Sequence, residues 1–259
     1  TVTILDVAEN TVSLEQQLRK SGPLLSSDDD PLEEPCTSLS LLLTAGALCN
    51  DATLEPDRED ADSYRAIGDP TEGALVVAAA RMDAWKPQLE KALPRVSEVP
   101  FTSERKRMTT VHSIDEAVRD QSDKETGWGS CLPVDGSTHV AFAKGAVDSL
   151  LDVSTRVWVN GEIEPLDDHW RGRIEAANDR LAQEGMRVLG AAFRPLDDLP
   201  ASGDEESLER DMIFVGMTGM IDPPREEVRQ AIATCRTAGI RPVMITGDHP
   251  LTAASIARE

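Results

Sequence analysis

The residues of this chain that could contact a phosphorylated ligand lie in a few short segments, and the most unusual of these follows Phe101. The chain is only 3% aromatic, yet Phe101 precedes the cationic run Arg105-Lys106-Arg107. An aromatic ring can stack on a base for roughly 1–3 kcal/mol, and a nearby cation can meet a phosphate group. The alternative is that Phe101 is a core residue at the end of a strand whose cations face solvent. That alternative is favoured when the segment is considered alone.

Two further cations stand at changes of secondary structure. Lys144-Gly145-Ala146 lies where a strand gives way to a helix, and a helix N-terminus favours anions. Gly185-Met186-Arg187-Val188-Leu189 ends a helix and begins a strand. Each segment is a weak signal alone, because lysine before glycine is common and an isolated Arg187 is typical of a protein surface.

Acidic residues mark two helix starts and one strand end. Glu72, in Asp69-Pro70-Thr71-Glu72, occupies the third helical position, where membership of a capping box is the simpler explanation. Asp222 precedes Pro223-Pro224-Arg225 and is available as a helix cap. Thr246-Gly247-Asp248 follows an apolar strand and offers a hydroxyl, a flexible backbone and a carboxylate. Such groups at the carboxyl end of a strand indicate phosphate chemistry.

Composition excludes several kinds of partner. The 47 acidic and 26 basic residues give a net charge of -21, so the general field repels nucleic acid. The sequence contains neither G-x-x-x-x-G-K-[ST] nor G-x-G-x-x-G. The four cysteines form no C-x-x-C pair, which is typical of reduced thiols, and the four histidines show no metal-ligand spacing. A site for a phosphorylated ligand here would need a local cluster of Lys and Arg that acts against the mean field.

The elements that must position these residues follow from hydrophobic periodicity and from capping residues. We expect a strand over 1–7, helices over 39–49 and from 70, strands over 99–111, 138–143 and 187–193, and a helix over 166–184. Polar segments 21–35 and 115–136 are expected to be exposed loops, the second inside a hairpin.

The last part of the chain changes character. A strand over 212–220, a helix over 223–239, a strand over 242–245 and a helix after Asp248 alternate in the order typical of a parallel α/β sheet. We therefore expect one whole domain over 1–221 and part of a second over 222–259.

Together and in this order, these segments resemble the type II P-type ATPases, the group of calcium and related cation pumps. The resemblance rests on six motifs: Gly68-Asp69-Pro70-Thr71-Glu72-Gly73-Ala74-Leu75, the residues 101–108, Lys144-Gly145-Ala146, Gly185-Met186-Arg187-Val188-Leu189, Asp222-Pro223-Pro224-Arg225 and the residues 243–248. It implies an α/β fold in which an antiparallel sheet flanked by helices, the nucleotide-binding domain, precedes a partial phosphorylation domain with a parallel sheet.

The resemblance also implies roles for particular residues. In the nucleotide-binding domain they are Phe101 stacked on adenine, Glu72 at the adenine edge, Lys106 and Lys144 in the pocket, Gly145 permitting close approach, Arg187 facing the phosphates and Leu189 on the wall. In the second domain, Thr246, Gly247 and Asp248 are expected near the transferred phosphate, and Asp222 and Arg225 at the hinge.

The implied cofactors are ATP and Mg²⁺, and the implied parent is a membrane pump that carries this part on its cytoplasmic face. Its phosphorylation, actuator and transmembrane domains would be the partners, and calcium is the first candidate ion. The acceptor aspartate of Asp-Lys-Thr-Gly-Thr is expected before Thr1 and the magnesium motif after Glu259, so the fragment alone should bind ATP without turnover. Ser103 stands where many calcium pumps have arginine, a contact that Arg105 could replace.

Two other classes of protein remain to be weighed. A free-standing nucleotide-binding module would leave the residues 212–259 without a sheet to join. A phosphatase of the haloacid dehalogenase type would need its own nucleophilic aspartate motif, and the sequence offers none. Both alternatives are therefore weaker than the pump fragment.

Overall fold

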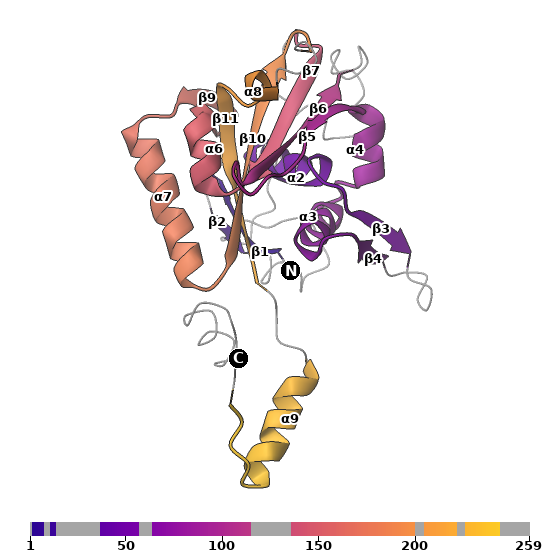
Figure 1. Ribbon diagram of the computed structural model, residues 1–259, viewed down its shortest axis with the longest axis vertical. Coiled ribbons are helices and arrows are strands. Elements are labelled where there is room, and N and C mark those ends of the chain that lie inside the picture. Colours follow the sequence, from indigo (N-terminus) through magenta and orange to yellow (C-terminus); the bar gives the residue numbers. More distant parts are fainter. Residues whose placement is uncertain are drawn as a thin grey trace.

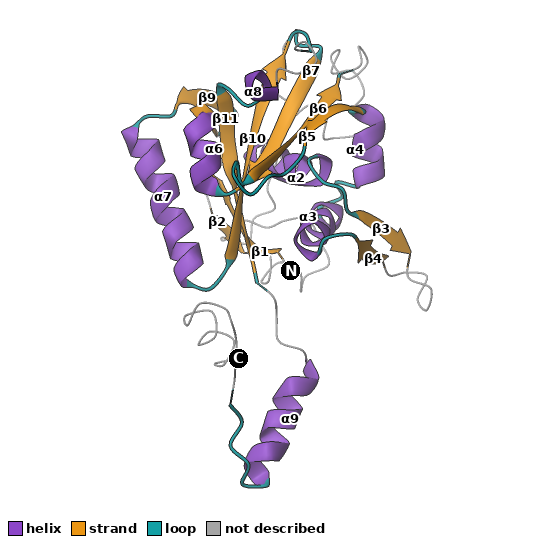
Figure 2. Cartoon of the chain, viewed as in Figure 1, coloured by secondary structure: helices purple, strands orange, loops and turns teal. Residues whose placement is uncertain are grey.

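In a computed structural model, the chain folds around one large, mostly antiparallel sheet with helices on both faces (Figures 1 and 2). The structure describes residues 2–7, 11–13, 37–56, 64–114, 136–199, 205–221 and 226–243. This is the antiparallel α/β architecture that the resemblance implied for the first domain.

The sheet brings together strands from both ends of the sequence. Its main path runs through β2 (Thr11–Ser13), β1 (Val2–Val7), β11 (Met212–Met220), β10 (Arg187–Leu196), β7 (His139–Gly145), β6 (Arg107–Ser113) and β5 (Arg95–Val99). β8 (Ser154–Val159) pairs in parallel with the start of β11, and β9 (Glu162–Pro165) pairs with β8. Every residue of β11 is buried, because layers of side chains cover both of its faces.

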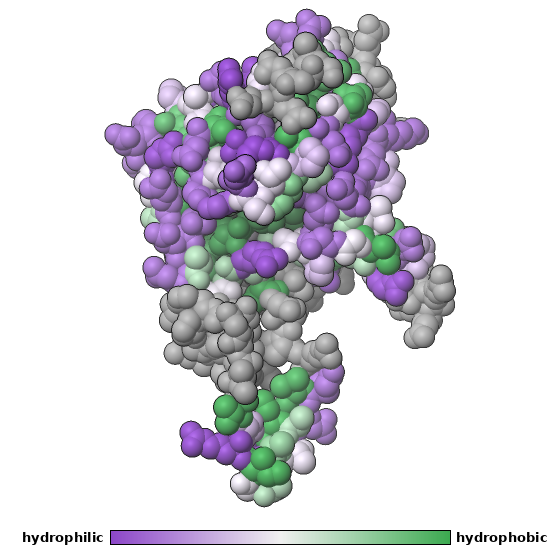
Figure 3. Space-filling view, in the orientation of Figure 1, coloured by the Kyte–Doolittle hydropathy of each residue, from purple (hydrophilic) through white to green (hydrophobic). Residues whose placement is uncertain are grey.

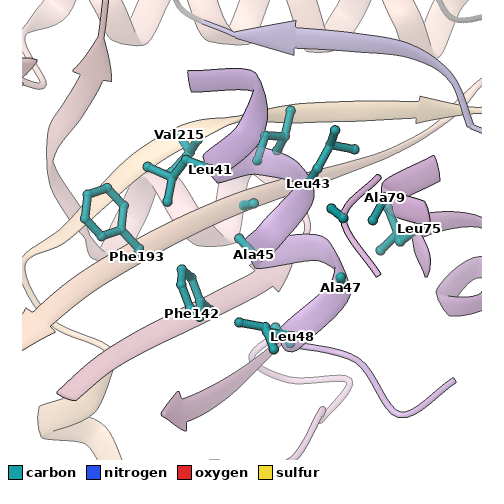
Figure 4. Packing of buried hydrophobic residues seen from close by; sticks show 14 of the residues in the cluster. Leu41, Leu43, Ala45, Ala47, Leu48, Leu75, Ala79, Phe142, Phe193 and Val215 are labelled. Atoms are coloured by element: carbon teal, nitrogen blue, oxygen red, sulfur yellow. The ribbon is translucent and has the colours of Figure 1, made fainter. Parts of the chain in front are cut away.

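One face of the sheet is covered by α2 (Thr37–Leu48). Figure 4 shows Leu41 and Leu48 of this helix turned toward Phe142, Phe193 and Val215 of the sheet. α3 (Pro70–Arg81) and α4 (Lys86–Ala92) lie alongside α2 and complete this layer. The helix α2 is buried on every side, and most of its residues are apolar; Ser38, Ser40 and Thr44 are buried with them.

The other face is covered by α6 (Val147–Val153) and α7 (Asp168–Gln183). Leu150 and Ile174 of these helices pack with Ala143 and Phe214 of the sheet. Neighbouring residues of β7 thus enter different cores, Phe142 the first and Ala143 the second. This is the two-residue alternation of a strand, and it fixes the side to which Lys144 points.

The remaining elements are small or peripheral. β3 (Thr53–Pro56) and β4 (Tyr64–Ile67) form a hairpin against α3, and α8 (Glu205–Leu208) precedes β11. α9 (Glu226–Thr237) is set apart from the sheet in Figure 1, and Figure 3 shows apolar atoms on its surface. Val228, which lies on α9, is 40% exposed.

Most of the expected elements are present, with two corrections. The strand over 212–220, expected to open a parallel α/β sheet, is β11, which pairs antiparallel with β1 and β10 inside the first sheet. The strand expected over 99–111 is two strands, β5 and β6, joined by a turn over 100–106. Pro100 has no N–H to donate to a ladder, and Lys106 has a φ of 51°, which is left-handed and breaks an extended strand. Phe101 therefore lies in a turn and not at the end of a strand.

Several sequence predictions concern residues outside the described ones. They are the loop over 21–35, the insertion over 115–135 and the residues 244–259, which include Thr246, Gly247 and Asp248. Asp222 and Arg225 are also outside, whereas Gly136 is described and exposed. Among the described residues, no helix combines the length and the apolar character needed to cross a bilayer.

Candidate functional site

The segments singled out in the sequence meet at one end of the sheet. β6 begins at Arg107, β7 ends at Gly145 and β10 begins at Arg187. Lys144 is paired with Met108 on one side and with Ala191 on the other. Residues more than 80 positions apart in the sequence, from Met108 to Ala191, therefore lie on neighbouring strands at this end (Figure 1).

Lys144 forms a largely buried ion pair with Glu72. Its side chain is 10% exposed and that of Glu72 is 17% exposed, and Lys144 Nζ lies 2.5 Å from Glu72 Oε1. The other carboxylate oxygen of Glu72 accepts a hydrogen bond from the backbone N–H of Asp51 at 3.1 Å. The pair joins the start of α3 to the end of β7 and places a cation and an anion side by side in a partly closed position.

The start of α3 explains why Glu72 is free to make this contact. Asp69 caps the helix, since its Oδ1 accepts from the N–H groups of Thr71 at 2.8 Å and Glu72 at 3.3 Å, and Pro70 occupies the first turn. The carboxylate of Glu72 points to Lys144 and Asp51 instead of returning to the cap. The capping-box explanation therefore does not describe the Glu72 side chain.

The loop after α2 contacts both the backbone and the side chain of Glu72. Asn50 Nδ2 donates to the carbonyls of Gly46 at 2.9 Å and Glu72 at 3.0 Å. Lys86 Nζ donates to the carbonyls of Asn50 at 2.6 Å and Ala52 at 2.9 Å, and burial lowers the pKa of Lys86. These contacts fix the residues on either side of Asp51, whose N–H donates to Glu72. The sequence analysis did not predict these contacts, although polar residues directly after an apolar helix, here Asn50 and Asp51, can indicate such a contact.

Arg95 fixes the same loop from β5. Its Nη1 lies 2.7 Å from Asp51 Oδ1, and the hydrogen bond from Arg95 holds the pKa of Asp51 below its usual range. Asp51 therefore stays ionised, and its ion pair with Arg95 ties the loop to β5.

The turn over 100–106 presents Phe101 to solvent. The ring is 60% exposed, so Phe101 is not a core residue. The Lys106 side chain is 57% exposed, and its Nζ lies 3.4 Å from Asp148 Oδ2 on α6. An aromatic face and a cation are thus available on one short turn.

Arg105 and Arg107 do not form the solvated face considered above. Both bind the carboxylate of Glu209, which is 4% exposed. Arg105 is therefore already engaged, and in this structure it does not stand free to replace an arginine at Ser103.

Gly145 connects the turn to the buried ion pair. A Cβ atom at Gly145 would lie 2.4 Å from the carbonyl oxygen of Lys106, a contact too close for any other residue. The next N–H, of Ala146, donates to that carbonyl at 3.0 Å. The glycine thus allows the Lys106 backbone to pack directly against the end of β7, next in sequence to Lys144.

Arg187 and Leu189 lie at the start of β10. Arg187 is exposed, and its Nη1 donates to Thr71 Oγ1 at 2.6 Å. Leu189 is partly buried and packs against the core beneath α2. The described residues with predicted binding roles therefore form two adjoining groups, one around the Glu72–Lys144 pair and one on the Phe101 turn. Among the described residues, no cluster of His, Cys, Asp or Glu side chains could hold a metal ion.

Comparison with known proteins identifies the class to which this arrangement belongs. Residues 38–227 match the family model described as "P-type ATPase, cytoplasmic domain N". Because the match covers most of the chain, the chain belongs to the P-type ATPase family.

The individual relatives that the chain matches are named as calcium-transporting or cation-transporting ATPases. The chain is 40% identical over 219 residues to "Calcium-transporting ATPase 1" of Bacillus cereus, covering 85% of this chain and 21% of that protein. It is 36% identical over 238 residues to "Probable cation-transporting ATPase F" of Mycobacterium tuberculosis, covering 91% and 23%. It is 37% identical over 221 residues to "Calcium-transporting ATPase" of Bacillus subtilis, covering 85% and 22%. The chain therefore spans about a fifth of the length of the relatives it matches.

Proposed function

We propose that this chain is the ATP-binding part of a cation pump that transports its ion through an aspartyl-phosphate intermediate. The observation that carries the proposal is the buried Glu72–Lys144 pair, set beside an exposed aromatic turn in a member of the P-type ATPase family. A buried cation next to a stacking surface suits a nucleotide, which combines an aromatic base with an anionic tail.

Each residue has a distinct part in the proposed site. Phe101 stacks on adenine, and Glu72 accepts a hydrogen bond from the adenine edge while it orients Lys144. Lys106 is exposed and loosely paired, which suits a cation that turns toward phosphate. Arg187 faces the phosphates from the start of β10, and Leu189 forms part of the wall.

The proposed domain boundary lies near Ile221. Val2 of β1 pairs with Met220 of β11, so the first domain starts and ends at adjacent positions of the sheet. That arrangement suits a domain inserted into another one. α9 follows the boundary, and its exposed Val228 suits packing against a phosphorylation domain. The roles of Thr246, Gly247 and Asp248 near the transferred phosphate, and of Asp222 and Arg225 at the hinge, belong to this proposal.

In the whole pump, a carboxylate oxygen of the acceptor aspartate attacks the γ-phosphorus of ATP, the bond to the β-phosphate oxygen breaks, and ADP leaves. The motif that carries this aspartate, Asp-Lys-Thr-Gly-Thr, does not occur in the sequence. Mg²⁺ would neutralise charge on the phosphates. Calcium is the first candidate ion, since two of the relatives above are named calcium-transporting.

The test is to titrate the 259-residue chain with ATP and, separately, to incubate it with γ-labelled ATP and Mg²⁺. We expect a dissociation constant of roughly 0.1–1 mM by nuclear magnetic resonance, with shifts at the Phe101 turn and near Lys144, and no label on the protein. Absence of binding at millimolar ATP would overturn the site. Labelling that depends on a residue of this chain would overturn the proposal that the acceptor lies elsewhere.

A further inference from the structure

We infer that Glu209 is a positioning residue for ATP, because it holds the turn that carries Phe101 and Lys106. Glu209 follows α8 and precedes β11, far from the turn in sequence. Its side chain is 4% exposed. The inference rests on the proposed function for its effect on ATP, but the geometry of the contact is independent of it.

Both carboxylate oxygens of Glu209 are occupied by donors from the turn and from the start of β6. Oε1 accepts from Arg105 Nη1 at 2.7 Å and from Thr109 Oγ1 at 2.8 Å. Oε2 accepts from Arg107 Nε at 2.8 Å. A buried carboxylate with two guanidinium partners and a hydroxyl has its charge compensated and its hydrogen-bonding capacity used.

The two arginines extend this anchor to both ends of the turn. Arg105 Nη2 donates to the carbonyl of Pro100, at the beginning of the turn. Arg107 Nη1 donates to Ser149 Oγ of α6 at 2.9 Å, and that hydroxyl donates to the carbonyl of Arg105. Glu209 therefore links the segment before β11 to the turn and, through Arg107, to α6.

The turn needs such an anchor because its own hydrogen bonds are few. Lys106 N–H donates to the carbonyl of Thr102 at 2.8 Å, and Arg105 N–H donates to Thr102 Oγ1 at 3.3 Å. Lys106 has a φ of 51°, a conformation that non-glycine residues adopt only where their surroundings impose it. Phe101 and Lys106 point to solvent, so neither is held by burial.

The test compares Glu209→Gln with Asp6→Asn. Asp6 is a suitable control because it is also a buried carboxylate, 1% exposed, with two arginine partners, Arg173 at 3.0 Å and Arg180 at 3.4 Å. Those partners lie on α7 and have no part in the turn. Each variant is examined by hydrogen exchange without nucleotide, by thermal unfolding and by ATP titration.

We expect Glu209→Gln to speed exchange of the Arg105 and Lys106 amides at least tenfold while the amides of β7 keep their rates, and to weaken ATP binding roughly tenfold, within the range that loss of base stacking can produce. Asp6→Asn should lower the melting temperature without either effect. Thr109→Val, which removes one neutral donor and leaves both arginines paired, should give the same changes at smaller size and remains usable if Glu209→Gln does not fold.

Two results would overturn the inference: unchanged exchange in the turn of Glu209→Gln and Thr109→Val, or an equal loss of ATP affinity in Asp6→Asn. Failure of the proposed function is seen separately. In that case the unaltered chain does not bind ATP, while the exchange measurement still decides whether Glu209 positions the turn.

Discussion

Lys144 and Lys106 are both proposed to meet ATP, yet the structure holds them in opposite ways. The Lys144 side chain is 10% exposed with Glu72 at 2.5 Å, whereas that of Lys106 is 57% exposed with Asp148 at 3.4 Å. Removing one partner of a buried pair costs about 3–5 kcal/mol, but an exposed pair contributes only about 0–1 kcal/mol. Lys144 therefore belongs to the stability of the fold as well as to the site, while Lys106 can leave Asp148 for a phosphate at little cost.

The largest effect is expected for Lys144→Met, which leaves the partly buried Glu72 without its cation. The free energy of unfolding should fall by about 3–5 kcal/mol, and ATP binding should weaken. The double variant Glu72→Gln with Lys144→Met removes both charges and should recover much of the stability. Urea unfolding of the single and double variants measures this, and a single variant as stable as the unaltered chain would contradict the burial argument.

The second largest effect is expected at acid pH, where the buried His112 should lower the free energy of unfolding. His112 is buried on β6, with Nδ1 2.8 Å from the carbonyl of Leu93, and burial lowers its pKa to about 4. The unfolded chain takes up this proton near pH 6.5 and the folded chain only near pH 4, so stability falls as the pH drops between these values. The loss should reach about 3 kcal/mol at pH 4.

Urea midpoints measured from pH 7 to pH 4 check this prediction. His112→Gln is the control, because it cannot take up the proton. If the control lost stability over this interval as steeply as the unaltered chain, His112 would not be the group responsible.

Phe101→Ala should separate binding from stability. The ring is 60% exposed, so its loss should leave the melting temperature nearly unchanged, while loss of stacking should weaken ATP binding by roughly 1–3 kcal/mol. Phe193→Ala is the matched control in the core, where a fully buried ring is removed and stability should fall by about 3–5 kcal/mol. A Phe101 variant that melts early and keeps its affinity would show that the ring supports the fold instead.

The smallest effect is expected for Lys106→Met. Stability should change by less than about 1 kcal/mol, and the loss of ATP affinity should shrink at high salt, because screening weakens charge-dependent attraction. Titration with adenosine as well as ATP checks the contact. An equal loss for the uncharged nucleoside would argue against a phosphate contact.

Local sequence signals predicted much of this fold. Asp69-Pro70 marks the start of α3, and the apolar run before Asn50 gives α2. Gly185 has a φ of 82° and separates α7 from β10 as expected. These features depend on residues close together in the chain, for which capping, periodicity and glycine conformation are informative.

The support of the candidate site could not be predicted in the same way. Arg105 and Glu209 are 104 positions apart and Lys144 and Glu72 are 72 apart, so neither pair leaves a local pattern. The expected strand over 99–111 ran through the turn after Pro100, although the residues 102–107 are all polar and lack the alternation of a strand. The family resemblance indicated Glu72 and Lys144 as site residues, but not that they bind each other.

The pairing of β1 with β11 has a mechanical consequence. Val2 lies opposite Met220 and Val7 opposite Gly216 in antiparallel register, so tension applied through the first and last strands would meet their hydrogen bonds one at a time. Two strands pulled apart from the same end separate at low force, because their hydrogen bonds break one after another. Strands pulled from opposite ends need more force, because their hydrogen bonds are loaded at the same time. Single-molecule stretching through Val2 and Met220 should therefore require less force than stretching through Val2 and Leu196, and equal forces would show that the load is shared by the whole sheet.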